Sequence, residues 1–145
     1  MLLKSERLLK KIIGGQFFAV LNSVGGGQPY SNLVTFTITS DLKSLVFITD
    51  RNTRKYRNIQ ENNHISILID NRTNQRSDIK NAIAITVIGT AREVIENKDS
   101  FQALFLERHP GIKQFVFDPD NALILVTIQE YVIAGFKKTQ RVYIG

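Results

Sequence analysis

The sequence of 145 residues has no cysteine, no tryptophan and only three prolines. Without cysteine, the chain can form no disulfide, thiolate metal site, iron–sulfur cluster or cysteine nucleophile. No apolar run approaches the ~20 residues that a membrane-spanning helix needs. The charged residues within positions 1–15 are not those of a signal peptide. We therefore expect a cytoplasmic protein with no membrane partner.

The composition that remains is that of an ordinary globular domain. Hydrophobic residues make up 43% and charged residues 22%, which excludes disorder and fibrous repeats. A chain of this length buries about two-thirds of its extended surface on folding, so we expect residues 1–145 to form a single domain. The net charge of +6 is compatible with a nucleic acid, a membrane surface or a small phosphorylated ligand.

Hydrophobic periodicity predicts a mainly β protein with short helices. An amphipathic helix is expected at about residues 2–13, ended by Gly14-Gly15 and packed on its own domain. Two further helices are expected, one capped by Asn52 or Thr53 and one running from an Asn97 cap to Leu106. The pattern also predicts strands, the last of them optional, at residues 16–24, 29–39, 44–49, 64–70, 82–95, 121–136 and 140–144.

Short turns between successive strands predict antiparallel pairing. Six to seven antiparallel strands favour a closed or half-closed β-barrel, because closure removes strand edges that would otherwise be exposed. A flat sandwich is the alternative. Gly89, inside the strand at 82–95, predicts a bulge or bend.

One polar cluster stands out at the start of the helix that follows the third strand. Free backbone N–H groups there favour an anion, arginine can hold a phosphate with two hydrogen bonds, and lysine adds a charge. The cluster suits one phosphate monoester, and the alternative is a solvated basic turn. It comprises Thr49, Arg51, Asn52, Thr53, Arg54, Lys55 and Arg57.

The sequence offers no metal site and no catalytic residue. The two histidines, His64 and His109, lie far apart and have no metal-like partner nearby in the sequence. No carboxylate pair stands out for acid–base chemistry, so the catalytic residues stay unassigned.

Residues 29–69 resemble the pyridoxamine 5′-phosphate oxidase-like flavoproteins of the FMN-binding split-barrel superfamily. The most specific feature is the spacing from Phe47-Ile48-Thr49 to Thr53-Arg54-Lys55. The resemblance implies a split barrel with FMN as its cofactor, the phosphate on the hydroxyl and basic residues and the ring against the second strand. The cofactor-binding residues that it implies are Ser31, Asn32, Leu33, Val34, Thr35, Ile48, Thr49, Thr53, Arg54 and Lys55.

The sequence also departs from the vitamin-B6 oxidase itself. Ser31 and Phe36 stand where that enzyme has an arginine and a lysine, Ala84 stands where it has a glutamine, and its C-terminal tryptophan is missing. The resemblance therefore implies a small FMN-dependent oxidoreductase of unknown substrate, or a protein that only binds flavin. We do not expect a true pyridoxamine 5′-phosphate oxidase.

Other functions stay open at this point. Related split barrels bind the deazaflavin F420 or haem, and a basic nucleic-acid-binding β-barrel module would also account for the +6 charge. Nucleic acid is disfavoured, because the cations fall on several unrelated segments without an interleaved aromatic platform.

The resemblance further implies a homodimer with cofactor sites at the subunit interface. The strand at 82–95 adds a physical reason, because it carries apolar residues on both of its faces. The interior of one barrel can cover only one of these faces, so the other would be exposed in a monomer. The polar loop at 71–81 is long enough to reach across the partner and touch its cofactor.

Overall fold

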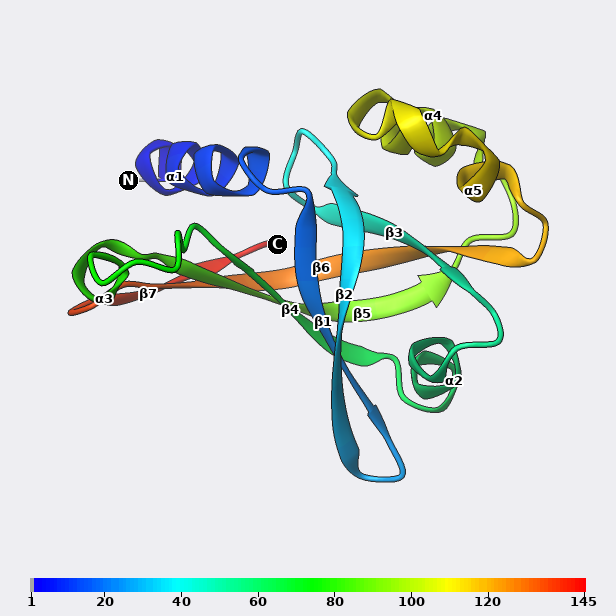
Figure 1. The fold of residues 1–145 in the computed structure, drawn as a ribbon, viewed down its shortest axis with the longest axis horizontal. Helices are drawn as coiled ribbons and strands as arrows, with labels where there is room; N and C mark the ends of the chain where they lie inside the picture. Colours follow the sequence, from blue (N-terminus) through cyan, green and yellow to red (C-terminus); the bar gives the residue numbers. More distant parts are fainter. Residues whose placement is uncertain (1) are drawn as a thin grey trace.

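The computed structural model describes residues 2–145 of the chain, and side chains from residue 4 onward. Figure 1 shows a barrel of antiparallel strands with short helices at its ends and sides. The strands are β1 (Phe18–Gly25), β2 (Gln28–Ile38), β3 (Ser44–Asp50), β4 (His64–Asp70), β5 (Ala84–Glu93), β6 (Asn121–Ala134) and β7 (Thr139–Tyr143).

Six of the seven strands close into a barrel. Their order is β3-β2-β1-β4-β5-β6, and β6 pairs back onto β3 from Ser44↔Thr127 to Asp50↔Asn121. The seventh strand, β7, pairs with β6 alone. Every pairing is antiparallel, so the predicted barrel of six to seven antiparallel strands is confirmed and the flat sandwich is wrong.

The three predicted helices are present, one of them with a different cap. The structure adds short helical elements at 78–81, within the predicted polar loop, and at 110–112 and 113–117. Thr53, rather than Asn52, is the N-cap of α2. Asn97 does not cap α4: it has φ of +57°, and the helix begins after Lys98, whose side chain makes no cap hydrogen bond. An N-cap residue has an extended backbone, and a residue with a left-handed backbone such as Asn97 does not meet this requirement. The helices are α1 (Leu2–Gly14), α2 (Arg54–Glu61), α3 (Asp78–Asn81), α4 (Asp99–Arg108), the 3₁₀ turn η1 (Pro110–Ile112) and α5 (Lys113–Phe117).

Strand β3 is buried on both faces. Leu45 and Phe47 point into the barrel core, whereas Val46 and Ile48 belong to a second apolar cluster. That second cluster is completed by Phe105 and Val116 from α4 and α5, together with Leu123 and Leu125 from β6. The helices α4 and α5 thus cover the outer side of β3, which agrees with the apolar run read from the sequence.

Gly89 lies at an irregularity of β5, as its position in the sequence predicts. The register between β5 and β6 shifts between Ile88 and Gly89. A Cβ atom at Gly89 would lie 2.3 Å from the carbonyl oxygen of Thr127 on β6. Only glycine permits this close approach of the two backbones.

Among the helices in the described part of the chain, none has the length and apolar character needed to cross a membrane.

Candidate functional site

The barrel is split between β2 and β3. Strand β2 pairs with β1 along residues 28–35 but with β3 only along residues 36–38. The two strands diverge beyond this point, as Figure 1 shows. In the described structure, the edge of residues 28–35 that faces β3 has no partner strand, so backbone N–H and C=O groups on that edge are available to a ligand.

Two hydroxyl groups lie at the N-terminus of α2, on the far side of this gap. The Oγ1 atoms of Thr49 and Thr53 are 3.1 Å apart, and Thr49 is almost completely buried. Thr53 Oγ1 donates to the Asp50 carbonyl at 2.8 Å and accepts a hydrogen bond from the Tyr56 N–H. The cap therefore holds both hydroxyls beside the free N–H groups of the first turn of the helix.

Arg54 connects α2 to β2. Its guanidinium carbon lies 4.3 Å from the centroid of the Tyr30 ring on β2, a cation–π contact. The Arg54 side chain is exposed, and no carboxylate among the described residues pairs with it. The fold thus brings the predicted phosphate cluster and the predicted ring-binding strand together.

Lys55 is a second cation without an ion pair in the described structure. Its side chain is half-buried, and burial lowers the pKa of the ammonium group while the nearby Asp50 carboxylate opposes that shift. An anion bound to a half-buried ammonium group replaces part of the hydration that the group has lost, so it stabilises the charged form. Arg54 and Lys55 together leave two positive charges to be neutralised by a ligand.

Asn32 carries an unsatisfied oxygen at the gap. It shares the inward face of β2 with Val34, and the β2–β3 register, if continued, would place Val34 opposite Thr49. The Asn32 Nδ2 donates only a long hydrogen bond of 3.4 Å to the Leu33 carbonyl, and Oδ1 is buried with no partner. A buried oxygen left unpaired costs about 1–3 kcal/mol, so this atom is suited to accept a hydrogen bond from a ligand.

The other predicted residues of β2 and β3 can contribute only backbone groups or an outer surface. Ser31 donates to Asn22 Oδ1 at 2.7 Å, and the side chain of Leu33 is 66% exposed on the same outer face of β2. Val34 and Ile48 are buried in the two apolar clusters. The alternation of side chains along a strand puts Ser31 and Leu33 on the face opposite to Asn32. Thr35 is half-buried on the same outer side, where it pairs with Phe18.

Arg51 is not free to bind a phosphate. It forms an ion pair with Glu93 of β5 at 2.5 Å and donates to the Pro119 carbonyl at 2.7 Å. The Tyr56 hydroxyl donates to the other Glu93 oxygen at 2.6 Å. Burial would raise the pKa of Glu93, but the hydrogen bonds from Arg51 and Tyr56 outweigh it and hold that pKa below its usual value.

This network fixes the turn before α2, and the sequence analysis missed it. Glu93 lies on a different strand, and no local signal in the sequence links it to Arg51. Of the remaining members of the predicted cluster, Arg57 is exposed and borders an open hollow beside Arg54.

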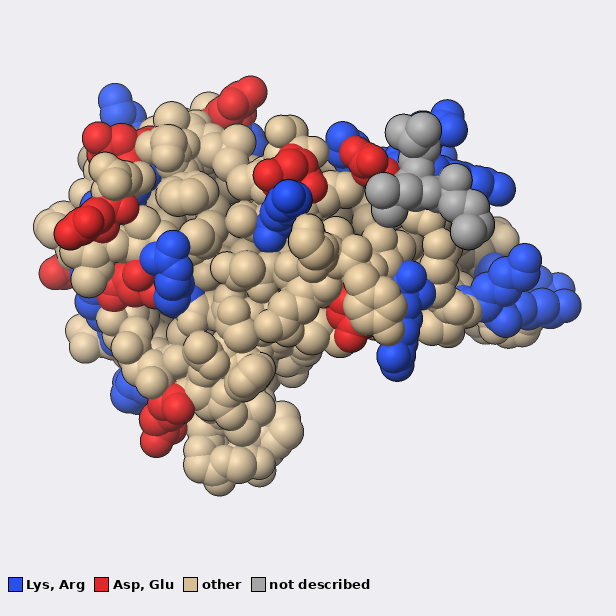
Figure 2. All heavy atoms as spheres, turned by 180° about the vertical axis from the view of Figure 1, so that it is seen from behind, with Lys and Arg blue, Asp and Glu red and all other residues tan. Residues whose placement is uncertain are grey.

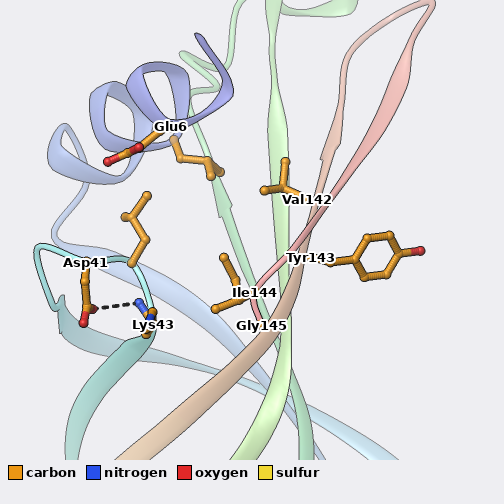
Figure 3. Close-up of a pocket in the computed structure, with 9 residues that line it drawn as sticks. Glu6, Asp41, Lys43, Val142, Tyr143, Ile144 and Gly145 are labelled. Atoms are coloured by element: carbon orange, nitrogen blue, oxygen red, sulfur yellow. Dashed lines mark hydrogen bonds between the residues drawn. The ribbon is translucent and has the colours of Figure 1, made fainter. Parts of the chain in front are cut away.

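A separate small pocket lies between α1, the β2–β3 turn and the end of β7 (Figure 3), with a volume of about 210 Å³. Its carboxylate at Asp41 already accepts hydrogen bonds from the Thr39 hydroxyl at 2.6 Å and the Lys43 N–H at 3.0 Å. These bonds hold the pKa of Asp41 below its usual value. The other carboxylate that lines the pocket, that of Glu6, pairs with Lys10 at 3.0 Å. Tyr143 points away from the pocket (Figure 3).

Residues 6–133 match the family model described as pyridoxamine 5′-phosphate oxidase, and the chain belongs to that family. A comparison with curated proteins gave no match. In the part of the chain that the structure describes, no group of three or more His, Asp or Glu side chains could hold a metal ion.

Solved structures with the same fold belong to proteins of diverse description. The chain is 22% identical to General Stress Protein 26 from Bacillus anthracis, with a TM-score of 0.72 over 98% of this chain and 100% of that one. It is 15% identical to a heme binding protein from Mycobacterium smegmatis, with a TM-score of 0.83 over 96% of this chain and 57% of that one. Campylobacter jejuni ChuZ is 16% identical, with a TM-score of 0.83 over 97% of this chain and 59% of that one. This chain therefore spans little more than half of the last two, and the likeness shows the fold.

Proposed function

We propose that the protein is an FMN-binding flavoprotein and acts as a small oxidoreductase. One observation carries the proposal: the contact between Arg54 and Tyr30 places a cation that has no ion pair in the described structure next to the open edge of β2, and Lys55 follows Arg54 in the same helix. A phosphorylated ring compound needs this combination, with positive charge at one end and a row of hydrogen-bonding groups at the other.

The phosphate would be held at the start of α2. Arg54 can donate two parallel hydrogen bonds, and Lys55 adds a charge whose half-burial strengthens its attraction to an anion. Thr49 and Thr53 offer hydroxyl groups 3.1 Å apart beside the free N–H groups of the helix. Arg51 would orient this turn through Glu93 without touching the ligand.

The flavin ring would lie along the open edge of β2. Its pyrimidine portion carries both N–H and C=O groups, which match the alternating groups of an unpaired strand edge. The unsatisfied Oδ1 of Asn32 can accept from a ring N–H. When bound, FMN supplies the redox chemistry, while the chain supplies binding and electrostatics.

Haem is the second candidate, because the heme binding protein from Mycobacterium smegmatis has the same fold with a TM-score of 0.83. Of the two histidines, His109 is engaged through Nε2 with the Phe36 carbonyl at 2.6 Å, and His64 is exposed at the start of β4. Neither is among the residues that line the open hollow beside Arg54.

The visible spectrum of the protein separates the two candidates. After purification and incubation with either FMN or haem, we expect a stable flavin spectrum with FMN and no specific haem band. A tightly held haem with no retained flavin would contradict the proposal. A test of the protein for oxidation of reduced nicotinamide then separates a flavin reductase from a protein that only stores flavin.

We also propose a homodimer with the cofactor sites at the subunit interface. Five side chains form a continuous row across the outward face of the barrel, since each pairs with the next in the strand register. The row consists of Leu33, Val20, Leu68, Thr86 and Val132. Four of the five are apolar, and Leu33 adjoins Asn32, so a second copy covering this row would lie next to the cofactor gap.

Light scattering of the flavin-loaded protein tests this arrangement. We expect the mass of two chains, and a Leu33→Asp variant should lower both the dimer fraction and the FMN affinity. A monomer with flavin still tightly bound would refute the shared site. The loop at 71–81 folds back on its own chain, with Asn71 and Ile83 joined by two hydrogen bonds, and its contact with a partner's cofactor stays a prediction.

A further inference from the structure

Two loops that are far apart in the sequence lie side by side at one end of the barrel. They are the β4–β5 connection, which contains α3, and the β6–β7 hairpin. Residues 80–83 and 135–138 line opposite walls of one open hollow of about 680 Å³. Both loops project at the end of the molecule away from α2 (Figure 1), so they are separate from the cofactor gap of their own chain.

These loops concentrate positive charge that is not neutralised within the described structure. Arg76, Lys80, Lys137 and Lys138 are all exposed, and none forms an ion pair there. The nearest carboxylates are already engaged. Asp70 pairs with Arg72 at 2.8 Å, and Asp78 accepts hydrogen bonds from the backbone and hydroxyl of Thr73. Figure 2 shows Lys and Arg gathered at this end.

Each loop also exposes one large apolar side chain directly before a lysine. Ile79 is 68% exposed and Phe136 is 56% exposed. We call this surface the basic tip, and it comprises Arg76, Ile79, Lys80, Phe136, Lys137 and Lys138.

The make-up of the basic tip favours one class of partner. Lysines bind an anionic lipid surface, and neighbouring apolar side chains enter the boundary between headgroups and acyl chains. A nucleic acid would be bound by stacking aromatic rings in a basic groove, but Ile79 cannot stack and the tip has only one exposed aromatic ring. An anionic membrane therefore fits these side chains better than a nucleic acid does.

We propose that the basic tip docks the protein onto an anionic lipid membrane. The four cations would contact lipid headgroups, while Ile79 and Phe136 enter the interface. The sequence-based expectation of no membrane partner rested on the lack of a membrane-spanning apolar run. It did not consider the cations at 76–80 and 136–138 together, because these residues lie far apart in the chain. The fold gathers them into one surface, and the proposal does not depend on the identity of the cofactor.

Vesicle co-sedimentation of the full-length protein tests the proposal. We expect binding to vesicles of equal amounts of phosphatidylcholine and phosphatidylserine, and none to phosphatidylcholine alone. Binding should weaken when the salt concentration is raised, since the attraction is screened. The Lys137→Ala/Lys138→Ala variant should bind roughly thirtyfold more weakly, and Phe136→Ser roughly tenfold more weakly.

The matched control is Arg92→Ala/Lys113→Ala, which removes two exposed cations from outside the basic tip and should leave vesicle binding unchanged. Far-UV circular dichroism checks that each variant is folded. Three results would overturn the proposal: no binding of the folded protein to anionic vesicles, equal losses in both double variants, or binding of a single-stranded oligonucleotide by the tip in place of vesicles.

Discussion

Arg54 and Lys55 are the residues on which the proposed cofactor site depends, because both are cations without an ion pair in the described structure. Replacement of Arg54 by alanine should weaken FMN binding about ten- to a hundredfold, since a charge-assisted pair is lost. Riboflavin, which lacks the phosphate, should bind wild type and variant nearly alike. Fluorescence quenching of the flavin at fixed salt measures both affinities.

Arg141→Ala is the control for this experiment. Arg141 is an exposed cation on β7, and hydrogen bonding with Tyr143 raises its pKa. Its loss should change FMN affinity less than the loss of Arg54. If Arg54→Ala weakened riboflavin as much as FMN, the assignment of Arg54 to the phosphate would be wrong.

Asn32 should act on the ring instead of the phosphate. An Asn32→Leu variant should bind FMN and riboflavin more weakly by about the same factor, roughly fivefold, because both ligands share the pyrimidine ring. The free protein should lose no stability to urea, since the change removes a buried oxygen that has no partner. Unchanged affinity for both flavins would show that Asn32 does not contact the ring.

Glu93 should stabilise the fold in a pH-dependent way. Its pKa is lowered in the folded protein by Arg51 and Tyr56, so the stabilisation is present above the usual glutamate pKa and is lost as the pH falls through the lower folded value. Glu93→Gln should cost about 1–2 kcal/mol at neutral pH, because Arg51 is partly exposed. Urea unfolding at a series of pH values should show the two proteins converging in acid, whereas a constant difference would contradict this role.

Predictions for single residues were correct where the feature depends only on residues nearby in the sequence. The cap at Asn52 or Thr53 follows from their place before a helical pattern, and the structure confirms it at Thr53. The pairing of Arg51 with Glu93 could not be predicted, because the two residues lie 42 positions apart in the chain and no local pattern links them. Strand alternation, applied to Ser31 and Leu33, would already have shown that their side chains cannot share one face with Asn32.

Among the secondary-structure elements, β5 provides the sharpest test of backbone packing. A Gly89→Ala substitution would bring a Cβ atom to 2.3 Å from the Thr127 carbonyl and 3.1 Å from Val126 Cγ1. The strands would have to separate, so we expect a loss of about 1–3 kcal/mol, measured by urea unfolding. Gly111→Ala is the control because nothing lies within 4 Å of its Cβ position. Equal stability of the two variants would refute the close-approach explanation.

The strands were predicted well because each carries a regular apolar pattern, and β3 shows its burial directly as a continuous apolar run. The five-residue α5 was not predicted, since it is too short for helical periodicity to be visible. It depends on tertiary packing, in which Val116 joins the cluster around Ile48. The Asn97 cap was wrong because asparagine is suited to both an N-cap and a left-handed turn.

At the scale of the whole molecule, closure and splitting of the barrel create the site. The pairing of β6 with β3 and the divergence of β2 from β3 depend on the strand register, which no local pattern specifies. The same long-range folding brings residues 80–83 beside residues 135–138 at the basic tip. The sequence therefore predicted the barrel, whereas the phosphate role of the basic cluster stays a prediction. It could not predict the gap between the strands or the gathering of surface charge.

The most direct test of the cofactor site is an FMN titration of the wild type and the Arg54→Ala/Lys55→Ala variant, followed by quenching of flavin fluorescence at fixed salt. The wild type should saturate at equal numbers of FMN molecules and chains. The double variant should remain folded and bind FMN at least about a hundredfold more weakly, because both unneutralised cations are gone. Equal FMN affinity of the two proteins would mean that the cluster at the start of α2 is only a solvated basic turn.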